Sequence, residues 1–430
     1  MPKALVTNRI YLDKPDALQL AKITKALTYK LPKKFIPNAK MGAIETITAY
    51  KLLPNGILSI PKMRLDLIPE NYEIVDKRTL CPVGFPAPLH NLYPEQEVVY
   101  NQVEDSCLVN ALVGWGKSFT ALFLARKLGQ KTLIVVHTLY LLEQWRDNVR
   151  VLFGIEPGVI TAGILDYKDS PIVISNTQSL AKQVPKLVSE FGTVVIDECH
   201  RTPSTTFTNI VDSLKARYVI GLSGTLIRKD GKHVLFRNYF GSTVFTPPKS
   251  NTLTPEVKIV KTGISLNANL PWASRITELV QNQQYQAFIA TLALGYMDKG
   301  HKVLVLADRV EFLEILGELI GDKCAVVTGT TGDRELVKKQ VMSGEKSCIA
   351  GSRQIFSEGV SINALSCVIL CVPMNNDSLL EQIIGRIQRL HPNKLTPLVL
   401  DMNFSGPTDR AQNESRFKFY LSKGWAIQSV

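Results

Sequence analysis

Short apolar runs alternate with helix-length amphipathic segments between residues 89 and 246. The runs are rich in Val, Ile and Leu, which is typical of strands that are buried on both faces. Strands separated by helices indicate a parallel sheet that is covered on both sides. The predicted strands are Leu108–Val113, Thr132–Val136, Ile172–Ser175, Thr193–Ile196 and Tyr218–Leu222.

A second series of the same kind begins near Ile276. Residues 247–270 lie between the two series and contain prolines and one β-like stretch, Val257–Val260, so we expect a structured connector there. The whole pattern predicts an α/β fold with two parallel-sheet units in tandem. The strands predicted for the second unit are Val303–Leu306, Ala325–Thr328, Ser347–Ala350, Val368–Cys371 and Pro397–Asp401.

The first 80 residues have a different pattern. Residues 15–29 show helical spacing of apolar positions, and Tyr50 to Ile60 predicts a hairpin about the turn Pro54-Asn55-Gly56. Residues 81–88 are rich in Pro and Gly and indicate a linker. We therefore expect a small basic α+β domain over residues 1–85, a first α/β unit over 86–250, and the connector with the second α/β unit over 251–430.

Composition adds a partner class to this picture. The 430 residues are 45% hydrophobic and 20% charged, which favours a soluble globular protein of two or three domains. The net charge of +12 indicates an anionic partner, and nucleic acid fits best. The first 80 residues hold 14 Lys and Arg against seven Asp and Glu, so they carry +7 of that charge.

The cysteines and the chain start bear on the compartment. Seven cysteines without a CxxC pair favour reduced core thiols over disulfides or zinc. The start, Met1-Pro2-Lys3, lacks the apolar stretch of a signal peptide, and no segment has the ~20 apolar residues of a membrane span. We expect a cytoplasmic protein with no membrane partner and no haem, zinc or flavin.

The segment Ala111-Leu112-Val113-Gly114-Trp115-Gly116-Lys117-Ser118 predicts a phosphate-binding loop, because it follows an apolar strand and precedes a helical segment. Gly114 and Gly116 allow backbone N–H groups to surround a β-phosphate, and the following helix adds the positive end of its dipole. Lys117 would neutralise the β- and γ-oxygens, and the hydroxyl of Ser118 would bind Mg²⁺.

Two adjacent carboxylates, Asp197 and Glu198, end another apolar strand and are followed by Cys199 and His200. Given the phosphate loop upstream, we predict that Asp197 holds Mg²⁺ and that Glu198 is the base for the attacking water. His200 would link this site to its neighbours through a hydrogen bond. A Cys199–His200 nucleophile pair is disfavoured, because adjacent residues rarely converge on one substrate atom.

The segment from Gln382 to Arg389 is the third candidate element. Gln382, Arg386 and Arg389 recur at helical i, i+4, i+7 spacing, which predicts one polar helix face. Arginines in a second α/β unit can stabilise the charge of a phosphoryl group during its transfer. A solvated helix face is the alternative.

In this order, the phosphate loop, Asp197-Glu198-Cys199-His200, Ser223-Gly224-Thr225 and Gln382 to Arg389 resemble the motifs of superfamily 2 helicases. The resemblance covers roughly residues 89–400 and implies two tandem RecA-like domains that use ATP and Mg²⁺. Within the superfamily the chain is similar to the DNA-remodelling XPB-, UvsW- and RecG-like motors. The compact size and basic N-terminal domain are most similar to a tailed-phage branch-migration helicase.

The same resemblance implies further roles, position by position. Gln96 would recognise adenine, Ser223 and Thr225 would couple hydrolysis to strand movement, and Leu226 stands where Pro is frequent. Many relatives have a ribose-contacting Asp where this chain has Ser361, so a nucleotide contact by that residue is not implied. The remaining ATP-binding positions implied are Trp115, Phe119, Glu358 and Gly359, and the implied nucleic-acid contacts are Thr138, Gln144, Trp145, Thr177, Gln178, Ser352 and Arg353.

These features together predict an ATP-dependent DNA helicase that unwinds or remodels forked and branched DNA. The alternatives are an RNA helicase, a restriction-type translocase subunit, and a binding module that uses ATP only as a switch. A strand-separating wedge is not clearly marked. Candidates are the N-terminal hairpin and a basic-aromatic segment after Thr225 with Phe236, Tyr239 and Phe240, although these aromatics suit a buried packing role equally well.

Overall fold

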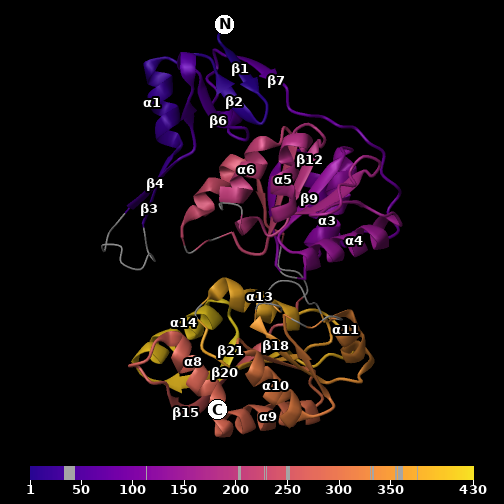
Figure 1. Cartoon of the computed structure of the whole chain (residues 1–430), viewed down its shortest axis with the longest axis vertical. Helices are drawn as coiled ribbons and strands as arrows, with labels where there is room; N and C mark the ends of the chain where they lie inside the picture. The colour runs from indigo at the N-terminus through magenta and orange to yellow at the C-terminus, as the bar shows by residue number, and fades with distance from the viewer. Residues whose placement is uncertain are drawn as a thin grey trace. The chain divides into compact units, whose positions relative to one another are not determined.

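The computed structural model describes the chain apart from residues 33–43, 113, 202–204, 227, 229, 248–251, 330, 332–333, 354–355, 357–361 and 375. It divides into two compact units, Met1–Ser250 and Asn251–Val430 (Figure 1). Each unit is described separately below. Among the described residues, no helix combines the length and the apolar composition needed to cross a membrane.

The first unit begins with a five-stranded sheet in the order β5-β6-β2-β1-β7, against which α1 packs. The predicted hairpin is confirmed, since β5 and β6 are antiparallel and Asn55 and Gly56 take positive φ angles of 66° and 80° in the turn. The elements are β1 (Lys3–Val6), β2 (Arg9–Leu12), α1 (Ala17–Ala26), β5 (Lys51–Leu52), β6 (Leu58–Pro61) and β7 (Glu73–Asp76).

Two further strands, β3 (Thr28–Pro32) and β4 (Ile44–Thr48), pair only with each other. Figure 1 shows this pair, the β3–β4 arm, extending away from the five-stranded sheet. Tyr29 and Ile47 of the arm pack against a hydrophobic cluster of the larger sheet that follows. Glu45 of β4 forms an ion pair with Lys232 at 3.1 Å.

Buried cations attach the N-terminal part to the rest of unit 1. Arg9 Nη1 lies 2.5 Å from Asp212 Oδ2, and its Nε donates to Ser59 Oγ at 2.8 Å. Lys62 Nζ donates to Leu214 O at 2.7 Å and to Val211 O at 3.3 Å, at the end of α6 (Thr205–Ser213). The N-terminal part is therefore tied to a helix of the larger sheet by hydrogen-bonded charges.

The larger sheet of unit 1 has seven parallel strands in the order β10-β11-β9-β12-β13-β8-β14. Short edge strands β10 and β14 were not predicted from the sequence, whereas all five predicted strands are present. The elements are α2 (Pro94–Gln102), β8 (Cys107–Asn110), α3 (Lys117–Leu128), β9 (Thr132–Val136), α4 (Leu139–Phe153), β10 (Gly158–Ile160), β11 (Ile172–Asn176), α5 (Thr177–Leu187), β12 (Thr193–Ile196), α6, β13 (Tyr218–Ser223), α7 (Phe236–Phe240) and β14 (Val244–Phe245).

Alternation along each strand explains why both faces of this sheet are covered. Leu133 and Val135 of β9 belong to one hydrophobic cluster, with residues of α5 and α6, and Ile134 and Val136 belong to another, with residues of α3 and α4. Figure 1 shows these two helix pairs on opposite sides of β9 and β12. The predicted doubly covered parallel sheet is thus confirmed.

Unit 2 repeats this architecture with the strand order β17-β18-β16-β19-β20-β15-β21. Its elements are β15 (Glu256–Ser265), α8 (Trp272–Gln281), α9 (Gln283–Asp298), β16 (Val303–Ala307), α10 (Val310–Ile320), β17 (Cys324–Val327), α11 (Arg334–Ser343), β18 (Cys348–Ser352), β19 (Cys367–Leu370), α13 (Asp377–Ile387), β20 (Leu398–Ser405), α14 (Pro407–Ser422) and β21 (Ala426–Ser429).

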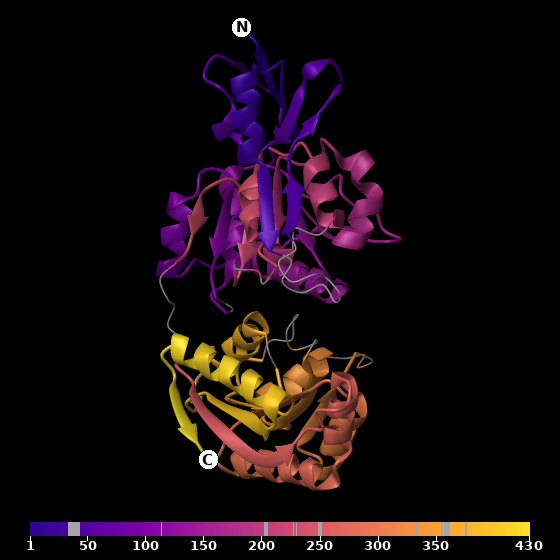
Figure 2. The ribbon, with the colours of Figure 1, turned by 90° about the vertical axis from the view of Figure 1, so that its left-hand side faces the viewer.

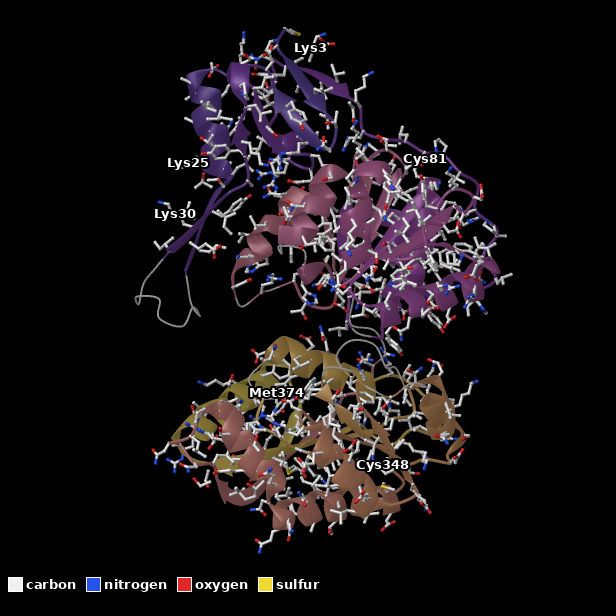
Figure 3. The ribbon with its side chains drawn as sticks, in the orientation of Figure 1. Lys3, Lys25, Lys30, Cys81, Cys348 and Met374 are labelled. Atoms are coloured by element: carbon white, nitrogen blue, oxygen red, sulfur yellow. The ribbon has the colours of Figure 1, made fainter. Side chains whose placement is uncertain are left out.

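The stretch Val257–Val260, predicted as part of a connector, lies instead within the sheet of unit 2. It belongs to β15, which pairs in parallel with both β20 and β21 (Figure 2). A buried ion pair, Arg416 with Asp401 at 2.8 Å, fastens α14 to β20. None of the seven cysteines is joined in a disulfide, and Cys348, labelled in Figure 3, belongs to β18 of this sheet.

Candidate functional site

The candidate residues of unit 1 gather at the carboxyl edge of its parallel sheet. The phosphate loop follows β8, Asp197 follows β12, and Ser223 ends β13, and these three strands are neighbours in the sheet. Carboxyl ends of parallel strands are where α/β folds bind ligands. Segments far apart in the sequence therefore meet at one edge.

The phosphate loop has the conformation that its glycines predict. Gly114 and Gly116 have φ angles of +93° and +92°, which residues other than glycine rarely adopt. Gly116 caps the N-terminus of α3, which begins at Lys117. Lys117 Nζ donates to Ala111 O at 2.7 Å, so the ammonium group lies over the loop. It is expected to neutralise the phosphates of a nucleotide bound there. Phe119 packs beside the hydrophobic cluster under α3.

Gln96 is buried against this loop rather than free at the surface. Its Nε2 donates to Trp115 O at 2.8 Å, and its Oε1 accepts from Tyr93 N at 3.0 Å. A Cβ atom on Gly116 would lie 2.2 Å from Gln96 Nε2, so only glycine fits there. The structure thus gives Gln96 a contact with the phosphate loop, and its expected recognition of adenine remains a prediction.

Asp197 and Glu198 occupy different environments. Asp197 is 8% exposed, and burial, together with the neighbouring Glu198 carboxylate, raises the pKa of Asp197 to about 6. Its Oδ1 accepts from Glu198 N at 2.9 Å. Glu198 is only partly buried and has a left-handed φ of +48°, a conformation that costs a non-glycine residue on the order of 1 kcal/mol. The buried acid suits metal binding and the more accessible one suits water activation.

His200 joins the carboxylate pair to β13, as the sequence predicts. Its Nδ1 lies 3.1 Å from Glu198 Oε2 and 3.2 Å from Ser223 Oγ. Ser223 Oγ also donates to Thr225 O at 2.7 Å and accepts from Thr225 N at 3.1 Å. A single ring nitrogen, His200 Nδ1, therefore lies within hydrogen-bonding distance of a residue expected to catalyse hydrolysis and of one expected to couple it.

Cys199 is fully buried, and burial raises the pKa of its thiol well above the usual value. A thiol in this state supplies little thiolate. The structure therefore argues against the nucleophile pair that was considered for Cys199 and His200.

Some expected nucleic-acid contacts lie at the same edge, on the far side of β12. Thr138 caps α4 after β9 by accepting from Leu141 N at 3.2 Å, and Thr177 opens α5 after β11, donating to Val136 O at 2.9 Å. Gln178 beside it is exposed, and Gln144 Nε2 donates to Tyr140 Oη at 3.2 Å. Strands β9 and β11 are neighbours, so these positions form one region.

Trp145 was expected to contact nucleic acid, and the structure corrects that expectation. The residue is 1% exposed in the cluster between α4 and the sheet. Its indole Nε1 donates to Asp197 Oδ2 at 2.9 Å. A side chain that is packed inward on a carboxylate is not available to a DNA backbone. The sequence gives its helix but not the direction in which the side chain points.

The aromatic wedge candidates are likewise buried. Phe236, Tyr239 and Phe240 are 4%, 7% and 0% exposed in the hydrophobic cluster beneath α7. Bases cannot stack on side chains that the core already covers. The packing alternative for these residues is confirmed.

In unit 2, Gln382 and Arg386 lie on α13, which ends at Ile387, so Arg389 lies beyond the helix. Arg386 is 5% exposed, so the alternative of a solvated helix face does not hold for this residue. Burial lowers the pKa of Arg389 to about 10, and its Nη1 lies 3.5 Å from Asn363 Oδ1. Two guanidinium groups are thus held partly or wholly out of water.

Ser352 and Arg353 follow one another at the end of β18. Ser352 is half-buried, and the guanidinium of Arg353 is paired with the carboxylate of Asp308. Glu358 and Gly359, expected to bind ATP, lie outside the described residues, as does Ser361.

Oxygen donors of the kind that Mg²⁺ prefers are present at the predicted site. Asp197 lies close enough to Lys117 of the phosphate loop for the ammonium charge to act on its pKa, and Ser118 is the next residue of that loop. Each oxygen of Asp197 accepts a hydrogen bond and retains a further lone pair for a cation or its water ligands. The residues therefore fit a magnesium ion held by one carboxylate and one hydroxyl.

Comparison with known proteins gives two family matches. Residues 89–228 match the family described as "Type III restriction enzyme, res subunit", and residues 283–391 match "Helicase conserved C-terminal domain". Together these matches contain the phosphate loop, both carboxylates, Ser223, Thr225 and both arginines.

Two of the relatives are phage proteins. "Probable helicase D10" of Escherichia phage T5 is 38% identical over 442 residues, covering 98% of this chain and 95% of the relative. "ATP-dependent DNA helicase uvsW" of Enterobacteria phage T4 is 27% identical over 363 residues, covering 77% of this chain and 72% of the relative.

One solved structure supports the fold. A Vibrio vulnificus fragment described as belonging to an HsdR subunit of a type I restriction enzyme aligns with a TM-score of 0.60 and 19% identity. The alignment covers 80% of this chain and 69% of that fragment. At this identity the likeness concerns the fold alone.

Proposed function

This chain belongs to the superfamily 2 helicases of the phage type, and we propose that it hydrolyses ATP with Mg²⁺ to unwind or remodel forked and branched DNA. It is a helicase with a nucleic-acid substrate. The observation that carries the proposal is that a phosphate loop, two carboxylates and Ser223 meet at one sheet edge. His200 Nδ1 lies there within 3.1 Å of Glu198 and 3.2 Å of Ser223.

In the proposed cycle, each described residue of unit 1 has one task. The loop N–H groups and Lys117 bind the β- and γ-phosphates, and Asp197 and Ser118 hold the cation. Mg²⁺, when bound, neutralises charge on the phosphate oxygens. Glu198 orients the attacking water and accepts its proton. His200 and Ser223 transmit the change at Glu198 to Thr225.

We assign the remaining expected residues to the two ligands of the motor. Arg386 and Arg389 stabilise charge on the transferring phosphoryl group, and Gln382 and Glu358 belong to the same ATP cycle. Thr138, Gln144, Thr177, Gln178 and Ser352 contact the phosphodiester backbone, which makes binding independent of sequence and sensitive to salt.

Preference for DNA rests on the relative from phage T4, which is named a DNA helicase. The basic N-terminal part, which is attached to α6 of the same unit, supports a branched substrate. A restriction-type translocase is the second candidate, because the family that matches residues 89–228 is described as a restriction-enzyme subunit. Such a translocase would move along DNA without separating its strands.

A substrate panel separates these candidates. ATP turnover and strand displacement are measured on forked DNA, four-way junctions, single-stranded DNA, duplex DNA and RNA. The proposal predicts the highest turnover on forks or junctions together with displacement of an oligonucleotide. Turnover driven by linear duplex without displacement would favour the translocase, and stimulation by RNA alone would refute a DNA substrate.

Variants of the catalytic residues test the site itself. Lys117→Ala and Glu198→Ala should each lower DNA-stimulated turnover by about 10²-fold or more, because a phosphate-neutralising cation or a positioned base is lost. DNA binding should remain near that of the parent. Lys299→Ala and Glu104→Ala, which change exposed residues of the same type, are the matched controls. Parental turnover in either catalytic variant would refute the assignment.

A further inference from the structure

A single side chain of α4 reaches the carboxylate that is expected to hold the metal. Trp145 Nε1 donates to Asp197 Oδ2 at 2.9 Å across 52 residues of sequence. Trp145 is 1% exposed and Asp197 is 8% exposed, so water competes little for this hydrogen bond. A bond of this kind to a charged acceptor in a dry environment is strong.

The two oxygens of Asp197 are held by two rigid donors. Oδ2 accepts from the indole, and Oδ1 accepts from the backbone N–H of Glu198 at 2.9 Å. Rotation of a carboxylate about its last side-chain bond is otherwise broad and roughly two-fold. Donors on both oxygens select one orientation of the carboxylate plane relative to β12.

The packing around Trp145 fixes the indole in turn. The ring lies in a cluster with Leu142 and Val149 of the same helix and with Ile174 and Val195 of the sheet. An apolar side chain would satisfy this environment without any polar atom. Burying an indole N–H there is favourable only because Asp197 accepts its hydrogen bond.

We propose that Trp145 is a positioning residue for the Mg²⁺-binding carboxylate of Asp197. It does not touch the nucleotide or the metal, and it acts by holding Asp197 in the orientation that binds the cation. The proposal rests on the proposed ATPase function. Partners that orient a metal ligand typically change metal affinity by about 10–100-fold when they are removed.

The test uses Trp145→Phe, which keeps an aromatic ring and removes the N–H donor. Binding of ADP to the full chain is measured by calorimetry over a series of Mg²⁺ concentrations. The Mg²⁺ concentration that gives half of the maximal ADP affinity should rise about tenfold or more. ADP affinity measured in EDTA should stay at the parental value, because the phosphate loop is unchanged.

Two companions make the result specific. Replacing residue 145 by benzothienylalanine keeps the shape of the indole and exchanges only the N–H for sulfur, so it should reproduce the shift without a packing defect. It also decides the matter if the phenylalanine variant folds poorly. Trp425→Phe changes a tryptophan of unit 2 that stacks on Tyr420 at 6.0 Å, and its Mg²⁺ dependence should match the parent.

The outcomes separate the inference from the function on which it rests. The role of Trp145 alone is overturned if ADP binding to the parental chain depends on Mg²⁺ and the benzothienylalanine variant needs the same Mg²⁺ concentration as the parent. The proposed function, and the inference with it, is overturned if ADP binding to the parental chain does not depend on Mg²⁺. A shift in both Trp145 variants, absent from Trp425→Phe, supports the proposal.

Discussion

One residue, His200, lies between Glu198, the proposed base, and Ser223, the proposed coupling residue. Its Nδ1 is within hydrogen-bonding distance of both Glu198 and Ser223, and neither contact requires a ligand. A side chain with two such partners can report a change at one of them to the other. The proposed coupling role depends on two contacts of one nitrogen atom, so single substitutions can test it.

We expect His200→Ala and Ser223→Ala to reduce strand displacement per ATP consumed more than they reduce ATP turnover. Both substitutions remove the His200–Ser223 contact, and a hydrogen bond has a net worth of about 1 kcal/mol. His200→Ala also removes the contact with Glu198, and Ser223→Ala also removes the hydrogen bonds with Thr225. Because the two substitutions share one contact, the double variant should lose less than the sum of the two single variants. Ser213→Ala, at an exposed serine of α6, is the control. Fully additive losses would contradict the link.

The candidate residues of the motifs could be chosen from the sequence, whereas the direction of buried side chains could not. Residue type and spacing alone single out the loop glycines, Lys117, Asp197 and Glu198. The inward indole of Trp145 and the buried ring of Phe240 depend on which helix face meets the sheet. A local pattern of polar and apolar residues leaves such a face undecided when an aromatic residue suits both a core and a ligand.

Central strands were predictable at the level of elements because they are buried on both faces. Predicted and observed limits agree for β9 and β12. The edge strands β10, β14 and β21 are short or partly exposed, so their apolar signal is weak. The β3–β4 arm was missed for a related reason, since its outer positions are exposed and each strand pairs on one side only.

The attachment of the N-terminal part to α6 predicts that the free energy of unfolding depends on pH. Burial lowers the pKa of Lys62 to about 7, against partial compensation by Asp212, while its Nζ donates to carbonyls at the end of α6. Between pH 7 and 10.5 the unfolded chain binds more protons at this lysine than the folded chain. Stability therefore rises with pH through this window, by at most about 1.4 kcal/mol per pH unit.

Urea unfolding of the parent and of Lys62→Met, followed by tryptophan fluorescence at pH 7, 8 and 9, measures this effect. The parental midpoint should rise relative to that of the variant as the pH increases, because methionine cannot titrate. Below pH 7 the lysine is charged in both states, so the difference should level off. A difference that is constant from pH 7 to 9 would show that Lys62 is not responsible.

At the scale of the whole molecule, the basic charge of the first 80 residues divides into two groups. Three of these cations, Arg9, Lys62 and Arg64, are buried within unit 1. They bond respectively to Asp212, to carbonyls at the end of α6, and to Asn238 of α7. They cannot also neutralise DNA phosphates. The exposed lysines of α1 and β3 remain for that purpose, and Figure 3 labels Lys25 and Lys30 among them.

Deleting the N-terminal part would be a poor test of its role. Met63 belongs to the same hydrophobic cluster as α5 and α6, and Tyr29 and Ile47 pack against that cluster. Truncation would therefore expose core surface of the ATP-binding unit, and any loss of activity would have two explanations. Charge reversal on the exposed side leaves this packing in place.

We predict that the triple variant Lys22→Glu, Lys25→Glu, Lys30→Glu binds forked DNA more weakly and with a shallower salt dependence. Each phosphate contact contributes about 0.9 to the slope of log affinity against log salt, so loss of three contacts should lower the slope by roughly two to three. The variant Lys261→Glu, Lys299→Glu, Lys323→Glu changes net charge equally on exposed residues of unit 2. Fluorescence anisotropy from 50 to 300 mM salt would compare them. Equal slopes in the two variants would show that the effect is one of total charge, and would remove the N-terminal surface from the proposed DNA interface.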